Sequence, residues 1–299
     1  MCGIAGLFLK DSALEPRLGE LLGGMMGPLS SRGPDSAGFA IYGDGRPDAV
    51  KLSLHGESEG HVTAVAGRLA EALGKELSFA IRHTHAIVSV PEGDLAHAEA
   101  WLAAHAPEIS VIGKGRRMEI FKEVGNPVAV GKAFGIETMR GSHGVAHTRM
   151  ATESAVTTDG AHPFSTGTDQ CLVHNGSLSN HNSLRRELRR EGVKIATEND
   201  SEVAAGYLTW RMRQGQSLGQ ALQSGLGDLD GFFTFVVGTE SGFGVLRDPI
   251  ACKPAVMAET DRYVAFGSEY RSLVDLPGID NARVWEPKPA TVYFWERGQ

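Results

Sequence analysis

From Gly231 to the end of the sequence, short apolar runs follow one another with turn residues between them, and this pattern constrains the fold more than any other. Earlier in the chain, two expected strands, 2–9 and 39–42, are separated by an expected helix at 18–26. Strands grouped in this way, without a regular β–α–β alternation, favour an α+β fold over a doubly wound parallel sheet. The late strands are expected at 232–237, 244–246, 263–266 and 291–295.

Residues 57–140 differ from the rest of the chain in their pattern of expected helices and strands. Helical and extended patterns alternate there, which predicts a small α/β insertion within one domain that spans 2–299. Asp94 is a good N-cap for the second helix of the insertion. Its expected elements are a helix at 61–73, an extended segment at 77–90, a helix at 95–104 and a strand at 109–112.

Turn and cap residues predict three further local features. Gly43-Asp44-Gly45 is expected to close a hairpin that joins the strand 39–42 to a return strand at 50–54. Gly192 is expected to end a helix over 183–190. A longer helix is expected to begin at Asp200 or Ser201, with one apolar face formed by Val203, Tyr207 and Trp210.

Charge and cysteine content exclude several classes of protein. The 29 basic and 36 acidic residues give a net charge of −7, and no long basic run suggests nucleic-acid binding. No secretory signal and no apolar stretch of membrane-spanning length is evident. Three widely spaced cysteines indicate neither a disulfide framework nor a zinc site, so we expect a cytoplasmic protein.

Cys2 is the first candidate for chemistry. Once Met1 is removed, a cysteine at this position carries both a thiol and a free α-amino group, whose reference pKa is about 7.7–8.0. Such an amine can take the thiol proton and later return it to a leaving group, so that one residue supplies nucleophile and general acid/base. The alternative is a small apolar residue at the start of a strand.

Five motifs, in order along the chain, resemble those of the class II glutamine amidotransferases. This family includes glucosamine-6-phosphate synthase, glutamine phosphoribosylpyrophosphate amidotransferase, asparagine synthetase and glutamate synthase. The resemblance covers about a third of the chain and implies a four-layer αββα N-terminal-nucleophile hydrolase sandwich. The motifs are Met1 to Gly6, Arg32 to Gly38, Gly144 to Thr152 with Ala161-His162-Pro163-Phe164, His174-Asn175-Gly176, and Asn199-Asp200-Ser201-Glu202.

The resemblance implies a catalytic set around Cys2. The side-chain amide of Asn175 and the backbone N–H of Gly176 would stabilise the tetrahedral oxyanion, which needs two preorganised donors. Arg32 would organise the surroundings of the nucleophile. Without the resemblance, Asn175-Gly176 is a common turn dipeptide and Arg32 a turn arginine.

The resemblance also implies a set of residues that bind glutamine. Arg149 would hold the α-carboxylate in a bidentate fork, Asp200 would pair with the α-ammonium, and Thr152 and His162 would complete the set. The alternatives are an ion-paired arginine on a strand and, for Asp200, a helix N-cap. Two positions depart from the family pattern: Met150 stands where tryptophan is frequent, and Glu153 where histidine is.

Two other kinds of site are not supported. His143, His147, His162 and His174 lack the spacing of metal ligands, so no metal is expected. The segment 125–132 resembles a phosphate-binding loop, but its glycines are one residue too far apart and Ala133 replaces the required hydroxyl.

The sequence therefore predicts a glutaminase that releases ammonia for a synthase partner. The late motifs Arg247-Asp248-Pro249 and Phe266-Gly267-Ser268-Glu269 resemble the end of the amidotransferase domain, so the acceptor chemistry is expected on another chain. Length and insertion resemble the amidotransferase subunit of glutamate-synthase-like enzymes such as N-methylglutamate synthase. That resemblance implies a hetero-oligomer in which partner subunits hold flavin and iron–sulfur centres and this chain holds no cofactor. A free-standing glutaminase, an amidotransferase for another acceptor and a non-catalytic interaction subunit remain as alternatives.

Overall fold

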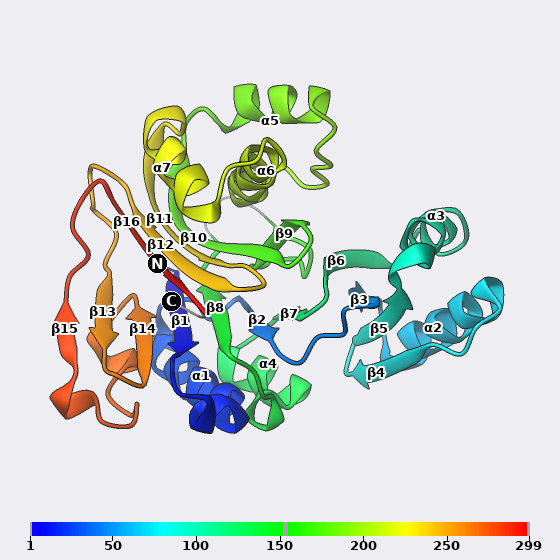
Figure 1. The fold of residues 1–299 in the computed structure, drawn as a ribbon, viewed down its shortest axis with the longest axis horizontal. Coiled ribbons are helices and arrows are strands. Elements are labelled where there is room, and N and C mark those ends of the chain that lie inside the picture. The colour runs from blue at the N-terminus through cyan, green and yellow to red at the C-terminus, as the bar shows by residue number, and fades with distance from the viewer. Residues whose placement is uncertain (1, 152–154, 298–299) are drawn as a thin grey trace.

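Two antiparallel sheets lie face to face, and helices cover the outer face of each (Figure 1). The computed structural model describes residues 2–151 and 155–297. Apolar side chains from both sheets, among them Ile4, Val145 and Val245, form a buried cluster between them. The α+β class and the four-layer αββα sandwich are therefore confirmed.

The first sheet has seven strands and contains the N-terminal strand β1 near its middle. Strand β1 pairs with β14 on one side and with β8 on the other. Helices α1 (Leu18–Met26) and α4 (Pro127–Phe134) cover the outer face of this sheet. The strand order is β15 (Arg283–Trp285), β13 (Val256–Glu259), β14 (Tyr263–Gly267), β1 (Gly3–Leu9), β8 (His143–Arg149), β2 (Ser36–Tyr42) and β7 (Met118–Val124).

The second sheet has five strands, and three helices pack on its outer face. Val203 and Tyr207 of α6 are buried there and Trp210 packs beside them, so the predicted apolar face of this helix is confirmed. The strand order is β16 (Thr291–Glu296), β12 (Gly242–Arg247), β11 (Gly231–Gly238), β10 (Gln170–Leu178) and β9 (Phe164–Gly167). The helices are α5 (His181–Arg190), α6 (Asp200–Arg213) and α7 (Leu218–Asp228).

A third, four-stranded sheet projects from the sandwich and has a core of its own (Figure 1). We call residues 49–115 the inserted sheet, together with its two helices. Its limits differ from the 57–140 expected for the insertion, since β3 begins earlier and β7 belongs to the seven-stranded sheet. The strand order is β4 (Ser78–Arg82), β5 (His85–Pro91), β3 (Ala49–His55) and β6 (Ser110–Gly115), with helices α2 (Glu59–Leu73) and α3 (Leu95–His105).

The predicted hairpin between 39–42 and 50–54 is wrong. Strand β2 pairs with β7 and β8, whereas β3 pairs with β5 and β6. The chain leaves the seven-stranded sheet after Tyr42 and builds the inserted sheet before β7 returns beside β2. A turn-rich segment such as 43–45 therefore marks a change of sheet here.

Two predicted helix caps also differ from the structure. Asp94 precedes α3, but its side chain makes no capping hydrogen bond and instead forms an ion pair with Lys75. The side chain that caps α6 is Asn199, which accepts a hydrogen bond from the Ser201 N–H at 2.9 Å. Asp200 is therefore the first helical residue, and its carboxylate is not the cap. Gly192, at φ +75°, follows α5 as expected.

Within the part of the chain that the structure describes, no helix combines the length and the apolar character needed to cross a membrane.

Candidate active site

The sulfur of Cys2 lies at the edge of the sandwich, beside the end of the neighbouring strand β8. Cys2 immediately precedes β1 and is half-buried. The backbone N–H of Met150 donates a hydrogen bond to its sulfur at 3.4 Å, and the Cys2 carbonyl accepts one from Arg32 Nε at 3.0 Å. The register of β1 against β8 thus brings the thiol next to the residues that follow Thr148.

The surroundings of Cys2 favour its thiolate. Burial on its own raises the pKa of the thiol, but interaction with the His147 side chain and with the backbone of Met150 outweighs burial and lowers this pKa to about 7. Cys171 makes a useful contrast, because burial raises the pKa of its thiol to about 12. Since the thiolate is the reactive form, Cys2 is the activated one of these two.

The side-chain amide of Asn175 is held in one orientation beside Cys2. Its Nδ2 donates to the Cys2 carbonyl at 3.3 Å and to Ser268 Oγ at 3.2 Å. Its Oδ1 lies 3.1 Å from His147 Nε2, which is also 3.2 Å from the His174 carbonyl. Because a carbonyl oxygen can only accept, His147 carries its proton on Nε2 and Asn175 presents its NH₂ group to the cysteine.

Glycine is required at position 176. Gly176 lies in β10 with φ +146°, a conformation that residues with side chains rarely adopt. A Cβ atom there would also lie 2.0 Å from the Phe232 carbonyl oxygen of the paired strand. The residue after Asn175 can therefore approach β11 closely only as glycine.

Arg32 connects Cys2 to a chain of alternating charges. Its buried guanidinium forms an ion pair with Glu269, and Glu269 also pairs with Arg271. Although burial alone raises the pKa of Glu269, the two arginines hold it below its ordinary value. Arg32 thereby fixes the backbone of Cys2 while its charge is balanced by a carboxylate.

Arg149 ends β8 and is buried, with 6% of its surface exposed. Its Nη1 donates to the Ala155 carbonyl at 3.4 Å. Thr152, predicted to lie beside it, falls outside the described residues. His162 is buried, and its ring contacts that of His147 in a tilted arrangement, with 4.0 Å between centroids. The glutamine-binding roles of Arg149, Thr152 and His162 stay predictions.

Asp200 lies on the far side of Asn175, at the first residue of α6. Its Oδ2 accepts the Leu178 N–H at 2.9 Å, and its Oδ1 lies 3.9 Å from His174 Nδ1. Strand β10 therefore links Asp200 to the surroundings of Cys2. Its side chain is partly exposed, as a carboxylate that meets a ligand needs to be.

Three residues at this site were not singled out from the sequence: His147, Ser268 and Glu269. All three stand in segments that resemble the family motifs, and this resemblance is the signal by which they could have been found. Their contact partners could not be derived from the sequence, because these depend on the pairing of β1 with β8 and β14.

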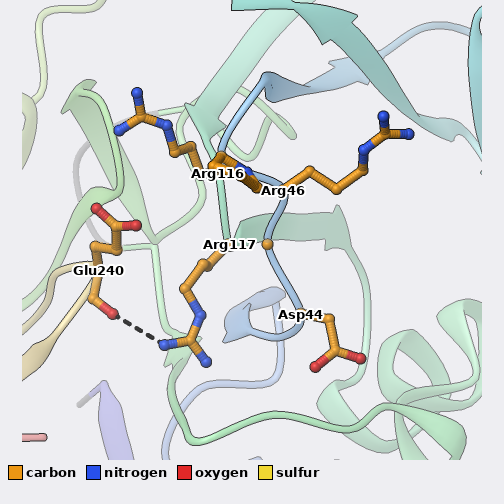
Figure 2. A pocket seen from close by; sticks show the side chains of 7 residues that line it. Asp44, Arg46, Arg116, Arg117 and Glu240 are labelled. Carbon is orange, nitrogen blue, oxygen red and sulfur yellow. Dashed lines mark hydrogen bonds between the residues drawn. The ribbon is translucent and has the colours of Figure 1, made fainter.

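A second candidate, a pocket of about 650 Å³, lies where the chain enters and leaves the inserted sheet. Figure 2 shows that the side chains of Arg46 and Arg116 point in different directions, and Arg117 donates to the Glu240 carbonyl. Arg46 and Arg116 also form ion pairs within the chain. These arginines therefore do not converge on a common anion position.

A metal centre has no ligand set in the described ranges, 2–151 and 155–297. No group of three or more histidine, cysteine, aspartate or glutamate side chains there is arranged to hold an ion. The buried histidines near Cys2 instead contact one another and the backbone.

Comparison with known proteins places the chain among glutamine amidotransferases. A family model described as a glutamine amidotransferase domain matches residues 147–275. The chain is 62% identical to the glutamine amidotransferase-like protein GlxB of Rhizobium meliloti, over 99% of this chain and 98% of that protein. It is 32% identical to a putative glutamine amidotransferase of Methanothermobacter thermautotrophicus, over 99% of this chain and all of that protein.

A solved structure shares the fold. The glutamine phosphoribosylpyrophosphate amidotransferase of B. subtilis, complexed with ADP and GMP, superposes with a TM-score of 0.63 at 17% identity. The superposition covers 99% of this chain and 47% of that one.

Proposed function

This chain belongs to the class II glutamine amidotransferases, and we propose that Cys2 is the nucleophile of its glutaminase reaction. The observation that carries the proposal is a half-buried thiol, with its pKa lowered to about 7, next to an amide held in a single orientation. The same arrangement argues against a non-catalytic interaction subunit, which would have no use for an activated thiol.

The proposed chemistry begins when removal of Met1 frees the α-amino group of Cys2. The sulfur attacks the side-chain amide carbon of glutamine, and Asn175 Nδ2 and the Gly176 N–H stabilise the oxyanion. The C–N bond then breaks, the α-amine passes the thiol proton to the leaving group, and ammonia departs. Water attacks the resulting glutamyl thioester, which releases glutamate and restores the thiol.

Glutamine is proposed to bind by its two charged ends. Arg149 would hold the α-carboxylate and Asp200 the α-ammonium, with Thr152 and His162 beside them. The positions of Arg149 next to Met150 and of Asp200 against β10 are consistent with a ligand that spans the region between β8 and α6. Arg32 would keep the Cys2 backbone in place during the reaction.

Ammonia is proposed to pass to a synthase partner of the glutamate-synthase or N-methylglutamate-synthase type, whose subunits would hold flavin and iron–sulfur centres. The alternatives are a free-standing glutaminase and an amidotransferase for another acceptor. Full glutaminase activity without a co-purified partner would favour the first of these.

The first prediction concerns Cys2→Ala. We expect this variant to lose glutamine hydrolysis by several orders of magnitude, because the reaction has no other nucleophile. In the complex with its partner, synthesis from added ammonia is expected to continue. The control is Cys252→Ser, which removes the exposed cysteine and leaves the Cys2 thiol in place. Retained glutamine hydrolysis in Cys2→Ala would refute the proposed nucleophile, and intact mass of the wild-type chain shows whether Met1 has been removed.

A further inference from the structure

Residues 155–162 lie against the guanidinium of Arg149, and we call them the clamp segment. The Ala155 carbonyl accepts from Arg149 Nη1 at 3.4 Å. A Cβ atom added at Gly160 would lie 3.9 Å from the same nitrogen. At its other end, the ring of His162 contacts the ring of His147, the residue that orients Asn175. The position of the clamp segment therefore affects the proposed binding site for the glutamine carboxylate.

The inserted sheet contacts the carboxylate of Asp159 in the clamp segment. Ser110 Oγ donates to Asp159 Oδ2 at 3.2 Å, and His55 Nδ1 lies 3.8 Å from Asp159 Oδ1. His55 and Ser110 are directly paired in the ladder between β3 and β6. Side chains of a directly opposed pair share one face of a sheet, so both meet the same carboxylate.

A second connection runs through Glu123 at the end of β7. Thr84, in the turn between β4 and β5, donates to Glu123 Oε2 at 2.9 Å, and Thr158 of the clamp segment donates to Glu123 Oε1. The inserted sheet therefore reaches the clamp segment at two points. These contacts join segments that are far apart in the sequence.

Lys122 binds the backbone of the clamp segment. Its Nζ donates to the carbonyl oxygens of Asp159 and Ala161, both at 3.0 Å, and the residue is 3% exposed. Burial lowers the pKa of this amine to about 8. Removing an ammonium from water is costly, so two backbone carbonyls fixed by a buried lysine indicate a segment whose position is tightly specified.

We propose that the inserted sheet sets the affinity for glutamine by holding the clamp segment against Arg149. Its positioning residues are His55 and Ser110, and Lys122 of the neighbouring strand β7 is a third. The inference rests on the proposed role of Arg149 in binding the glutamine carboxylate. None of the three positioning residues contacts Arg149 directly in the contacts that the structure describes. They act through Asp159 and its neighbours.

The test is a double-mutant cycle of Ser110→Ala and Asp159→Ala. Each single variant is expected to raise the KM for glutamine roughly three- to tenfold, the effect of losing one hydrogen bond of ordinary strength. The kcat should stay within about twofold, because the nucleophile and the oxyanion donors are untouched. The double variant should be no worse than Asp159→Ala alone, since both changes remove the same contact.

A binding readout makes the test independent of turnover. Glutamate is expected to slow alkylation of Cys2. The glutamate concentration that halves the alkylation rate should rise in each variant by the same factor as the KM for glutamine. The matched control is Lys75→Gln, which breaks the Lys75–Asp94 ion pair inside the inserted sheet but contacts no residue of the clamp segment. This control should leave both quantities unchanged.

The outcomes separate this inference from the proposed function. Activity retained in Cys2→Ala would refute the nucleophile. A second outcome would overturn only the role of the inserted sheet. In it, Cys2→Ala is inactive, but Ser110→Ala and Asp159→Ala change neither the KM for glutamine nor the glutamate concentration that halves the rate of Cys2 alkylation. Fully additive effects in the double variant, or a fall in kcat without a change in KM, would overturn it as well.

Discussion

At the site, the side chain of His147 interacts with both Cys2 and Asn175. Its Nε2–H holds the Asn175 amide, and the ring as a whole lowers the pKa of Cys2. One residue thus couples the state of the nucleophile to the orientation of the proposed oxyanion donor. Ser268 supports the same amide from β14's end, where it also accepts the Ile4 N–H at 2.8 Å.

The second prediction concerns the reactivity of this thiol. In a Cys252→Ser background, the rate of Cys2 alkylation should rise with pH around a midpoint of about 7, since the thiolate forms above its pKa. In His147→Asn the midpoint should move upward, because burial then raises the pKa without opposition from the imidazole. Alkylation rates followed by intact mass provide the measurement.

His97→Asn is the matched control for that experiment, since His97 is exposed on α3 and far from the site in the fold (Figure 1). It should leave the midpoint unchanged. An identical midpoint in His147→Asn and the wild-type chain would show that the imidazole does not tune the thiol.

At the scale of elements, the junction between β6 and β7 depends on one aspartate. Three consecutive backbone N–H groups, of Arg116, Arg117 and Met118, donate to the Asp169 carboxylate at 2.7–3.0 Å. Gly115 is required beside it, because a Cβ atom there would lie 2.2 Å from Asp169 Oδ1. Asp169 stands in the turn between β9 and β10, so it joins the five-stranded sheet to the base of the inserted sheet.

The third prediction follows from that carboxylate. Asp169→Ala leaves three backbone donors without their acceptor and should lower the free energy of unfolding by about 3 kcal/mol or more. Asp169→Asn keeps one acceptor oxygen and should be the less harmful of the two. Denaturant unfolding of both variants measures the difference. Equal stability of Asp169→Ala and the wild-type chain would contradict this account of the junction.

Sequence patterns were sufficient for most strands and helices but not for their partners. The apolar runs that became β1 and β14 were predicted close to their observed limits, because alternation and β-branched residues are local properties. The prediction of a hairpin after Tyr42 was wrong, because strand pairing is decided by packing between distant segments. Strand β7 and helix α4 were not predicted.

The site was predicted in a similar way. Cys2, Arg32, Asn175 and Gly176 were identified through resemblance, and the structure brings them together around the cysteine. The contacts of His147 and Ser268 could not be derived, because they require the register of three strands. The contact between the inserted sheet and Asp159 could not be predicted from the sequence either, because it joins residues 49 or more positions apart.

At the scale of the whole molecule, two interior histidines make stability depend on pH. Burial lowers the pKa of His143 to about 3 and that of His85 to about 2. His143 stacks on Tyr42 between the two large sheets, with 4.1 Å between ring centroids, and its Nε2 donates to the Thr239 carbonyl. Both rings are therefore neutral in the folded chain across the physiological range.

The fourth prediction is a loss of stability in mild acid. The unfolded chain protonates these histidines below about pH 6.5, whereas the folded chain does not, so their contribution is complete above that pH and declines below it. Between pH 7 and pH 5 each should cost about 2 kcal/mol of the free energy of unfolding. Denaturant midpoints at the two pH values measure the change.

His143→Gln should weaken that pH dependence, because it removes one of the titrating groups, whereas His97→Gln on the surface should leave it unchanged. The comparison uses the difference between pH 7 and pH 5, not absolute stability. A variant with the same pH dependence as the wild-type chain would show that His143 does not contribute.

The central place of β1 in its sheet has a consequence for biosynthesis. The first strand to leave the ribosome gains its two neighbours only when 143–149 and then 263–267 have been translated. Such long-range pairing is slow to form, because the intervening chain must be brought back to its beginning. The surroundings of Cys2 are consequently assembled near the end of translation, so a nascent or truncated polypeptide carries an ordinary cysteine in place of the proposed nucleophile.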